Sequence, residues 1–263
     1  MKEIIAVINQ KGGVGKSTTA LALGAGLLRK GFKVLRVDLD AQGNLTYTMA
    51  ADTKEPTALD LLAKRAKLTH VIRHTIQGDV IPSNPALAGA DITLTETGKE
   101  YRLKEALESI AKDYDYIIID TPPALGILVI NALTASTSAI VPAQADIYSL
   151  QGIGQLYQTI DAVRRYCNPN LIVKGILLTR YNARSILSRD LADVIQETAE
   201  QFHTEIFKTF IRENIAVKEA QARRQDLFKY APKSNAALDY ASFVDEFLNG
   251  REANKNDDTK EEF

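Results

Sequence analysis

The hydrophobic residues of this chain fall into short, almost continuous apolar runs that are separated by longer amphipathic stretches. Continuous apolar runs are typical of strands in a sheet that is covered on both faces. Strands are predicted over residues 3–8, 33–38, 79–82, 116–120, 138–142, 171–179 and 205–211. Helices are predicted over residues 16–30, 58–68, 102–112, 127–135, 151–165, 187–202 and 236–248. This alternation predicts the α/β class, with a doubly wound, mostly parallel sheet flanked by helices.

The composition suits one globular unit. With 263 residues, of which 45% are hydrophobic, the chain can bury a large core. We expect a single domain over residues 1–250. The tail over residues 251–263 is charged and nearly free of large apolar side chains, so we expect it to be disordered. The formal net charge of -1 excludes a protein that is basic throughout, and contact with nucleic acid would therefore require a local basic patch.

Cysteine content and the start of the chain indicate the compartment. Cys167 is the only cysteine, so the chain can form neither an internal disulfide nor a thiolate cluster, which suits a reducing environment. Met1 is followed at once by a strand-like run, without the charged and apolar regions of a leader peptide. No run approaches the roughly 18 apolar residues of a transmembrane helix. We therefore expect a cytoplasmic protein.

A glycine-rich loop stands between the first predicted strand and the first predicted helix. Residues 11–18 read Lys-Gly-Gly-Val-Gly-Lys-Ser-Thr. The glycines allow the backbone to wrap a phosphate chain with its N–H groups, and the helix N-terminus adds partial positive charge. Lys16 is placed to reach the β- and γ-phosphates, and Ser17 is placed to bind Mg²⁺. The predicted nucleotide-binding residues are Gly12, Gly13, Val14, Gly15, Lys16, Ser17 and Thr18, the last of which faces the α-phosphate.

Two residues distinguish this loop from the usual G-x-x-x-x-G-K-[ST] pattern. Gln10 stands where that pattern has its first glycine, and Lys11 is an additional lysine. The sequence K-G-G-x-G-K-[ST] resembles the signature of the deviant Walker A ATPases, P-loop NTPases that include the ParA/Soj partition proteins and MinD. This resemblance implies ATP and Mg²⁺ as cofactors. It also implies a homodimer in which Lys11 acts in catalysis by reaching the ATP of the partner subunit.

The strand predicted over residues 33–38 leads into two acidic residues. Asp38 and Asp40 are two residues apart, so they project to the same side of an extended chain. Paired carboxylates beside a phosphate site can serve Mg²⁺ and the attacking water. By resemblance to the family segment D-x-D-P-Q-G-N, Asp40 positions the hydrolytic water and Asp38 lies nearer to the metal. Ala41 replaces the family proline.

The strand predicted over residues 116–120 also ends in an acidic residue, Asp120. An aspartate in this position is typical of a Walker B element, which holds Mg²⁺ through a water. The alternative is an aspartate that only caps the following helix. The predicted metal-binding residues are Ser17, Asp38 and Asp120, and the predicted catalytic residues are Lys11, Lys16 and Asp40. Groups of these types suffice for slow hydrolysis of ATP.

Within the family, the resemblance is to the Soj-like partition ATPases and covers about residues 1–248. Segments at residues 81–91, 120–133 and 149–153 are similar to that subfamily, although a generic P-loop fold does not require them. The resemblance implies an ATP-dependent dimer that binds nonspecific DNA and is associated with the nucleoid. Slow ATP hydrolysis, stimulated by a ParB-like centromere-binding protein, would then drive plasmid or chromosome partitioning.

Two alternatives share the phosphate loop. A MinD-like positioning ATPase acts at a membrane surface, and proteins of that kind end in a basic amphipathic helix. Residues 251–263 instead contain three basic and five acidic residues, so we expect no membrane contact. A metabolic kinase with a similar loop is the other alternative.

Nonspecific DNA binding requires lysines and arginines that can neutralise phosphates. Residues 212–233 contain six basic and three acidic residues, and further arginines follow the strand predicted over residues 171–179. The predicted DNA-binding residues are Arg184, Arg189, Lys218, Arg223 and Arg224. For each of them the alternative is a solvated basic face that does not meet DNA. Ala216 occupies a position where the family has a DNA-binding arginine.

Overall fold

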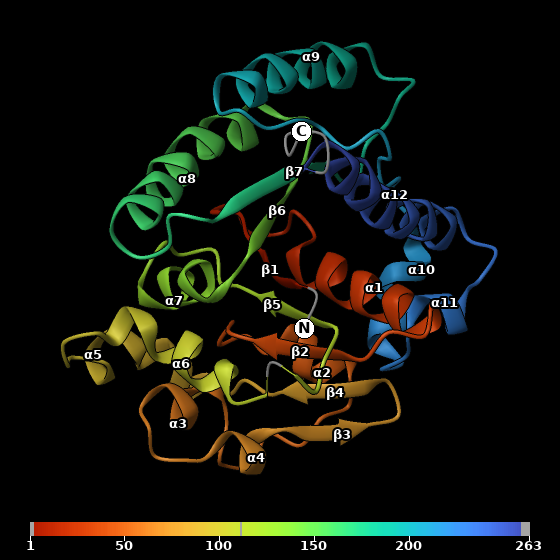
Figure 1. Cartoon of the computed structure of the whole chain (residues 1–263). Coiled ribbons are helices and arrows are strands. Elements are labelled where there is room, and N and C mark those ends of the chain that lie inside the picture. The colour runs from red at the N-terminus through yellow and green to blue at the C-terminus, as the bar shows by residue number, and fades with distance from the viewer. Residues whose placement is uncertain (1–2, 111, 259–263) are drawn as a thin grey trace.

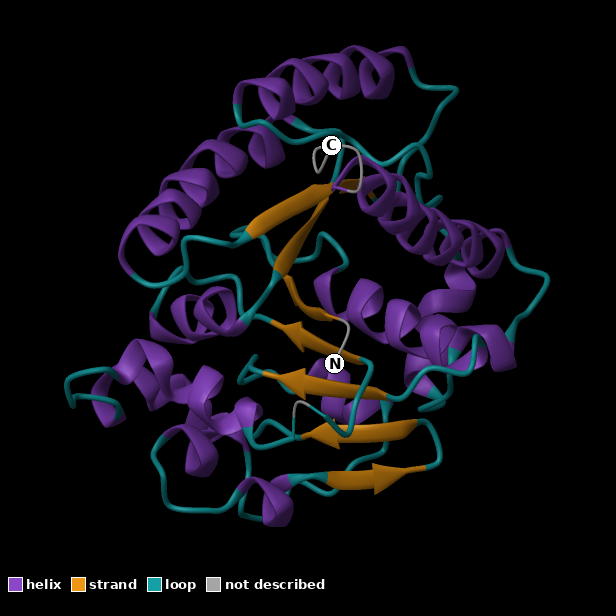
Figure 2. Cartoon of the chain, in the orientation of Figure 1, coloured by secondary structure: helices purple, strands orange, loops and turns teal. Residues whose placement is uncertain are grey.

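The chain folds around one seven-stranded sheet in the order β3-β4-β2-β5-β1-β6-β7, with helices on both faces (Figures 1 and 2). The computed structural model describes residues 3–110 and 112–258. The parallel strands are β1 (Glu3–Val7), β2 (Val34–Asp38), β4 (Gly78–Ile81), β5 (Tyr116–Asp120), β6 (Ser138–Ala143) and β7 (Ile172–Leu178). Only β3 (Arg73–Thr75) pairs antiparallel among the described strands. The predicted α/β class with a mostly parallel sheet is confirmed.

The sheet separates two hydrophobic layers. In β1, Ile4 and Ala6 contact one layer, whereas Ile5 and Val7 contact the other. One face carries α1 (Lys16–Arg29), α2 (Asn44–Thr48), α10 (Ile215–Ala222), α11 (Leu227–Tyr230) and α12 (Asn235–Asp258). The opposite face carries α3 (Ala58–Leu62), α4 (Leu68–Val71), α5 (Ala90–Thr93), α6 (Arg102–Glu108), α7 (Ile127–Ala135), α8 (Ile147–Tyr166) and α9 (Ile186–Gln201). Two short 3₁₀ helices, Pro85–Gly89 and Lys99–Tyr101, flank α5.

Two predicted elements differ from the structure. The strand predicted over residues 205–211 forms two isolated bridges in the described structure. Ile206 pairs with Ile176 of β7, and Ile211 pairs with Thr179, the first residue after β7. Between the two bridges the N–H groups of Lys208 and Thr209 donate to the Glu246 carboxylate of α12 instead of to β7. The helix predicted over residues 58–68 divides into two short helices, α3 and α4. In the segment at residues 205–211 a contact with α12 outweighs the local pattern.

The last helix extends past the boundary predicted at residue 250. α12 continues to Asp258, so part of the predicted tail is helical. Residues 259–263 of that tail lie outside the described residues, and their disorder stays a prediction. No helix in the described part of the chain combines the length and the apolar character needed to cross a membrane.

The packing of α1 on the sheet depends on a buried arginine. Arg36 of β2 is 1% exposed, and its guanidinium donates to the backbone carbonyl of Gln77 at 2.9 Å. Burial lowers the pKa of Arg36 to about 10, and the charge of Asp226 opposes this change. The guanidinium lies against Gly24 of α1, where a Cβ atom would overlap with it. A glycine at this position therefore allows α1 to approach β2 closely.

Replacing Gly24 with alanine is expected to destabilise the fold, although alanine favours a helix more than glycine does. Overlap with Arg36 should lower the free energy of unfolding by about 1–3 kcal/mol, which urea denaturation followed by circular dichroism would measure. Gly152→Ala in α8 is the matched control, because a Cβ atom there meets no neighbour. Helix propensity alone should then raise stability by about 0.5–1 kcal/mol. A stabilised Gly24→Ala variant would contradict this account of the packing.

Candidate nucleotide-binding site

The glycine-rich loop connects β1 to α1 at the edge of the sheet where the parallel strands end. Gly13 and Gly15 have φ angles of 78° and 90°, in the left-handed region that favours glycine. Residues after two other strands hold the loop. The Thr179 hydroxyl donates to the Val14 carbonyl at 2.7 Å, and the Gln144 amide donates to the Gly13 carbonyl at 3.1 Å. The loop is therefore fixed at the helix N-terminus in a form suited to a phosphate chain.

A cleft of about 530 Å³ opens over this loop and extends to α2 and α10. Its size is in the range of small-molecule sites. Asp40, Pro123 and Gln221 contribute to its walls. Val14 is fully buried and does not line the cleft. The other predicted nucleotide-binding residues line it, namely Gly12, Gly13, Gly15, Lys16, Ser17 and Thr18.

The neighbouring strands β2 and β5 bring two carboxylates together beside this loop. Their register pairs Asp38 with Asp120, and both residues are 0% exposed. Neither oxygen of Asp120 accepts a hydrogen bond of good geometry from a described residue. Burial raises the pKa of Asp120 well above its usual value and the charge of Asp38 adds to the rise, while the Ser17 hydroxyl and Lys16 oppose it. A buried carboxylate without a hydrogen bond of good geometry, next to the Ser17 hydroxyl, fits Mg²⁺.

Lys16 is the buried cation of the site. It is 7% exposed, and its ammonium group donates to the Lys11 carbonyl at 3.1 Å. Burial lowers the pKa of Lys16, and the nearby charges of Asp120 and Asp40 oppose this effect. Lys16 also lines the cleft. A phosphate oxygen there would gain a charge-assisted hydrogen bond in surroundings that exclude most water.

Asp38 and Asp40, which the sequence predicts to act together, have different surroundings. Asp38 points into its own loop, where its carboxylate accepts from the N–H of Asp40 at 3.1 Å and from the N–H and hydroxyl of Thr46 at 2.8 and 2.6 Å. Burial raises the pKa of Asp38 to about 6, and these hydrogen bonds oppose the rise. Asp40 instead lines the cleft, and its carboxylate accepts from the N–H of Gln42 at 3.0 Å. A metal role for Asp38 stays a prediction.

Lys11 does not line this cleft. Its ammonium group pairs with Asp146 at 2.5 Å and lies 5.9 Å from the centre of the Tyr148 ring. Asp146 is also the N-cap of α8, because its carboxylate accepts from the N–H of Ser149 at 2.9 Å. The sequence does not predict the ion pair, since 135 residues separate its members. A cap before the predicted helix is the one signal that could have drawn attention to Asp146.

Gln221 of α10 is a second site residue that sequence reasoning missed. Its amide donates to the Thr18 hydroxyl at 3.0 Å, and Gln221 lines the cleft. The two residues are 203 positions apart, so no local motif marks the contact. This hydrogen bond joins the phosphate site to the helix that carries Lys218.

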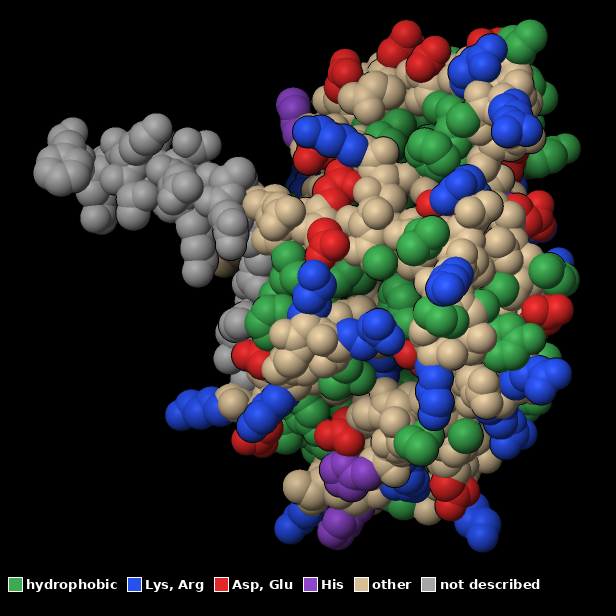
Figure 3. Space-filling model, turned by 90° about the vertical axis from the view of Figure 1, so that its right-hand side faces the viewer, with side chains coloured by type: hydrophobic (Ala, Val, Ile, Leu, Met, Phe, Trp, Pro, Cys, Tyr) green, Lys and Arg blue, Asp and Glu red, His purple; other side chains and the backbone are tan. Residues whose placement is uncertain are grey.

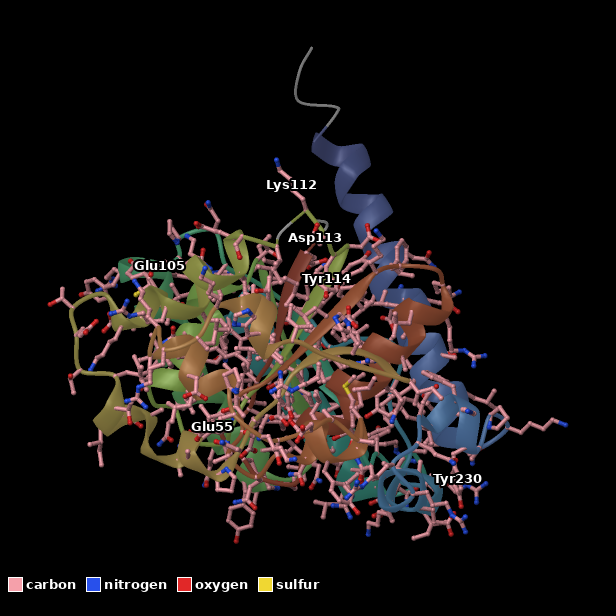
Figure 4. The ribbon with its side chains drawn as sticks, turned by 90° about the horizontal axis from the view of Figure 1, so that it is seen from below. Glu55, Glu105, Lys112, Asp113, Tyr114 and Tyr230 are labelled. Atoms are coloured by element: carbon pink, nitrogen blue, oxygen red, sulfur yellow. The ribbon has the colours of Figure 1, made fainter. Side chains whose placement is uncertain are left out.

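The five predicted DNA-binding residues are all exposed, and they fall around the start of α9 and the end of α10. The Arg223 and Arg224 guanidinium groups lie over the rings of Tyr230 and Tyr47, at 5.7 and 4.2 Å from the ring centres. Figure 4 shows Tyr230 on the opposite side of the molecule from Tyr114, which precedes β5. The end of α10 therefore lies on the side where the strands end, as the cleft does.

Other basic residues of this region have acidic partners. Arg180 pairs with Glu213 at 2.5 Å, and Arg212 pairs with Asp239 at 2.6 Å. Within the described part of the chain, no acidic group lies within 4 Å of the Lys218 ammonium group. On the face that lies at the right of Figure 1, lysines and arginines are spread between acidic and hydrophobic side chains (Figure 3).

The sequence matches known proteins over nearly its whole length. Residues 2–173 match the family described as an AAA domain. The chain is 42% identical over 251 residues to the sporulation initiation inhibitor protein Soj of Bacillus subtilis, covering 94% of this chain and 98% of Soj. It is 36% identical over 262 residues to the chromosome partitioning protein ParA of Myxococcus xanthus, covering 98% of this chain and 89% of that protein.

A solved structure has the same fold as this chain. Cobyrinic acid a,c-diamide synthase of Mycobacterium smegmatis, crystallised with an ATP analogue and magnesium, is 34% identical with a TM-score of 0.84. The similarity covers 97% of both chains. The phosphate loop, the strand-end carboxylates and the relatives lead to the same conclusion. This chain belongs to the ParA/Soj family of deviant Walker A ATPases.

Proposed function

We propose that this chain is a DNA-partition ATPase. ATP and Mg²⁺ convert it into a homodimer, the dimer binds nonspecific DNA of the nucleoid, and slow hydrolysis releases the DNA. A ParB-like centromere-binding protein stimulates the hydrolysis. The observation that carries the proposal is the grouping of Lys16, Asp40 and Asp120 around a fixed phosphate loop, with Lys11 outside the cleft. The names Soj and ParA of its relatives, and the ATP analogue and magnesium in another relative, support it.

Hydrolysis at this site relies on position and charge, because phosphoryl transfer needs little covalent chemistry from the protein. Asp40 is the carboxylate that lines the cleft, so it orients the attacking water. Lys16 and the loop N–H groups bind the phosphates. Ser17 and Asp120 are the residues that would hold Mg²⁺, which when bound neutralises charge on the phosphate oxygens. Without a covalent intermediate or a second general base, the monomer turns over slowly.

Lys11 is the residue that suits a site built from two subunits. Its side chain is 27% exposed and is bonded to Asp146 at the rim rather than to its own cleft. A triphosphate offers more negative charge than one carboxylate, so a second chain that presents ATP to this rim competes with Asp146 for the ammonium group. In a homodimer, the Lys11 ammonium group of each subunit would therefore add a positive charge beside the nucleotide of the other subunit.

DNA binding depends on a limited set of residues, because the whole chain has a formal charge of only -1. Lys218 and Arg184 are exposed at the side of the molecule where the strands end. Arg189 and Arg223 extend this set, although each already contacts its own chain through the Ala183 carbonyl or the Tyr230 ring. These residues would contact the phosphate backbone without reading the sequence.

DNA binding should depend on ATP. In fluorescence anisotropy with nonspecific duplex DNA at low salt, we expect the wild type to bind with ATP and not with ADP or without nucleotide. Lys16→Ala should abolish binding because the phosphate site loses its cation. Asp40→Ala should retain it, since this change removes the water-orienting carboxylate and leaves the phosphate loop intact. DNA binding that ignores the nucleotide, or its absence at low salt, would contradict the partition function.

The same protein should not sediment with liposomes of anionic lipids in the presence of ATP. Sedimentation that requires ATP would instead favour the MinD-like alternative. Phosphorylation of a small metabolite would favour the kinase, which incubation with labelled ATP and metabolite mixtures would reveal.

Lys11→Ala should abolish the ATP-dependent dimer and leave the ATP affinity of the monomer nearly unchanged, because Lys11 does not line its own cleft. Light scattering after gel filtration and titration with a fluorescent ATP analogue would measure the two effects. Asp146→Asn is the matched variant, because asparagine still caps α8 but no longer holds Lys11 by charge. Its dimer should form at lower protein concentration. A Lys11→Ala variant that loses ATP affinity would place the lysine in its own subunit's site.

Single substitutions should identify the basic residues that meet DNA. For Lys218→Ala and Arg184→Ala, the slope of log K against log salt concentration should become less steep by about one unit each. Arg212→Ala is the comparison variant, because the Arg212 guanidinium is already paired with Asp239, and its slope should match the wild type. Titrations at several salt concentrations measure these slopes. If all three variants have the slope of the wild type, the surface that contacts DNA lies elsewhere on the protein.

A further inference from the structure

A ring of hydrogen bonds closes around the loop that carries Asp40. The Asp38 carboxylate accepts from the backbone N–H of Asp40 at 3.1 Å and from the Thr46 hydroxyl at 2.6 Å. The Thr46 hydroxyl in turn accepts from the backbone N–H of Ser83 at 2.9 Å. The Ser83 hydroxyl donates to the backbone carbonyl of Asp40 at 2.5 Å. The ring therefore begins and ends on the backbone of Asp40.

The side chains of this ring are shielded from water. Asp38 and Thr46 are 0% exposed, and Ser83 is 1% exposed. Hydrogen bonds in such surroundings are electrostatically stronger than in water, and a buried donor or acceptor that loses its partner carries a desolvation penalty. Removal of one hydroxyl would thus leave other members of the ring unsatisfied. The ring should respond as a unit.

The ring joins three elements whose places are set by the sheet. Asp38 ends β2, Thr46 lies in α2, and Ser83 follows β4 by two residues. β2 and β4 are parallel neighbours, with Val37 paired to Ile81. Both strands therefore end at the same edge, and the ring ties the loop after β2 to the end of β4 as well as to its own strand.

We infer that Thr46 and Ser83 are positioning residues for ATP hydrolysis, and that Asp38 serves the ring as its central acceptor. The inference rests on the proposed ATPase function. The ring holds both the N–H and the carbonyl of Asp40, so the direction in which the Asp40 carboxylate enters the cleft is fixed before a nucleotide binds. Neither Thr46 nor Ser83 lines the cleft, and both therefore act through Asp40.

The effect of this positioning on rate should be large. A displacement of about 1 Å in a group that orients a reactant can cost roughly 100-fold in rate. The phosphate loop is anchored separately, by Gln144 and Thr179. Loss of the ring should therefore lower kcat without lowering ATP affinity. A ring that only stabilised the fold would lower both together.

The test compares deletions of single hydroxyl groups. Thr46→Val and Ser83→Ala should lower kcat for ATP hydrolysis by about 10- to 100-fold, with unchanged affinity for a fluorescent ATP analogue. Thr46→Ser retains the hydroxyl and should restore most of the rate. Thr134→Val is the matched control, because Thr134 is 1% exposed but its hydroxyl has no hydrogen-bond partner in the described structure. Wild-type rates in Thr46→Val, or a parallel loss of ATP affinity, would overturn the inference.

Hydrogen exchange tests the ring without hydrolysis. In protein free of nucleotide, Thr46→Val and Ser83→Ala should accelerate exchange of the Asp40 amide relative to the wild type, and Thr134→Val should not. If the wild type hydrolyses ATP but the Asp40 amide exchanges at the wild-type rate in both ring variants, the positioning role of Thr46 and Ser83 is overturned and the proposed function is not. If the wild type does not hydrolyse ATP, the proposed function is overturned. The role assigned to Thr46 and Ser83 is then overturned with it, even if exchange of the Asp40 amide changes in the ring variants as expected.

Discussion

Two carboxylates that meet at the ends of neighbouring strands govern the rest of this site. The register of β2 and β5 places Asp38 beside Asp120, and both are fully buried. Like charges in such surroundings disfavour ionisation of both groups unless each is compensated. Asp38 is compensated by N–H and hydroxyl groups of its own loop. For Asp120 the compensating groups are the Ser17 hydroxyl and the charge of Lys16, and neither carboxylate oxygen has a hydrogen bond of good geometry from a described residue. The sheet that buries these residues thereby makes binding of Mg²⁺ with a phosphate chain favourable.

The sequence predicts the parts of the site that are local in the chain. The phosphate loop is one continuous motif between a strand and a helix, and Asp40 and Asp120 follow or end predicted strands, which parallel pairing brings to one edge. Contacts between distant segments leave no such local pattern. The pairing of Lys11 with Asp146 and the contact of Gln221 with Thr18 depend on how loops meet after folding.

The same limit applies to strand prediction and to charge counting. The segment at residues 205–211 has the apolar character of a strand, but Glu246 of α12 accepts two of its N–H groups. The count of basic residues overestimates the number of unpaired cations, because Arg180 is paired with Glu213 and Arg212 with Asp239. Ala216, at the position where the family has an arginine, is only 7% exposed. Lys218, two residues further along α10, is exposed.

The buried arginine of β2 limits how this sequence can change during evolution. Gly24 and Gly78 both face the Arg36 guanidinium, and a side chain at position 24 has no room while the arginine is present. A relative with a short aliphatic residue at position 36 gains that room. Positions 24 and 36 should therefore covary among relatives, although they lie on different elements. A lineage that changes position 24 first has to shift α1 away from β2, so the order of the two substitutions matters.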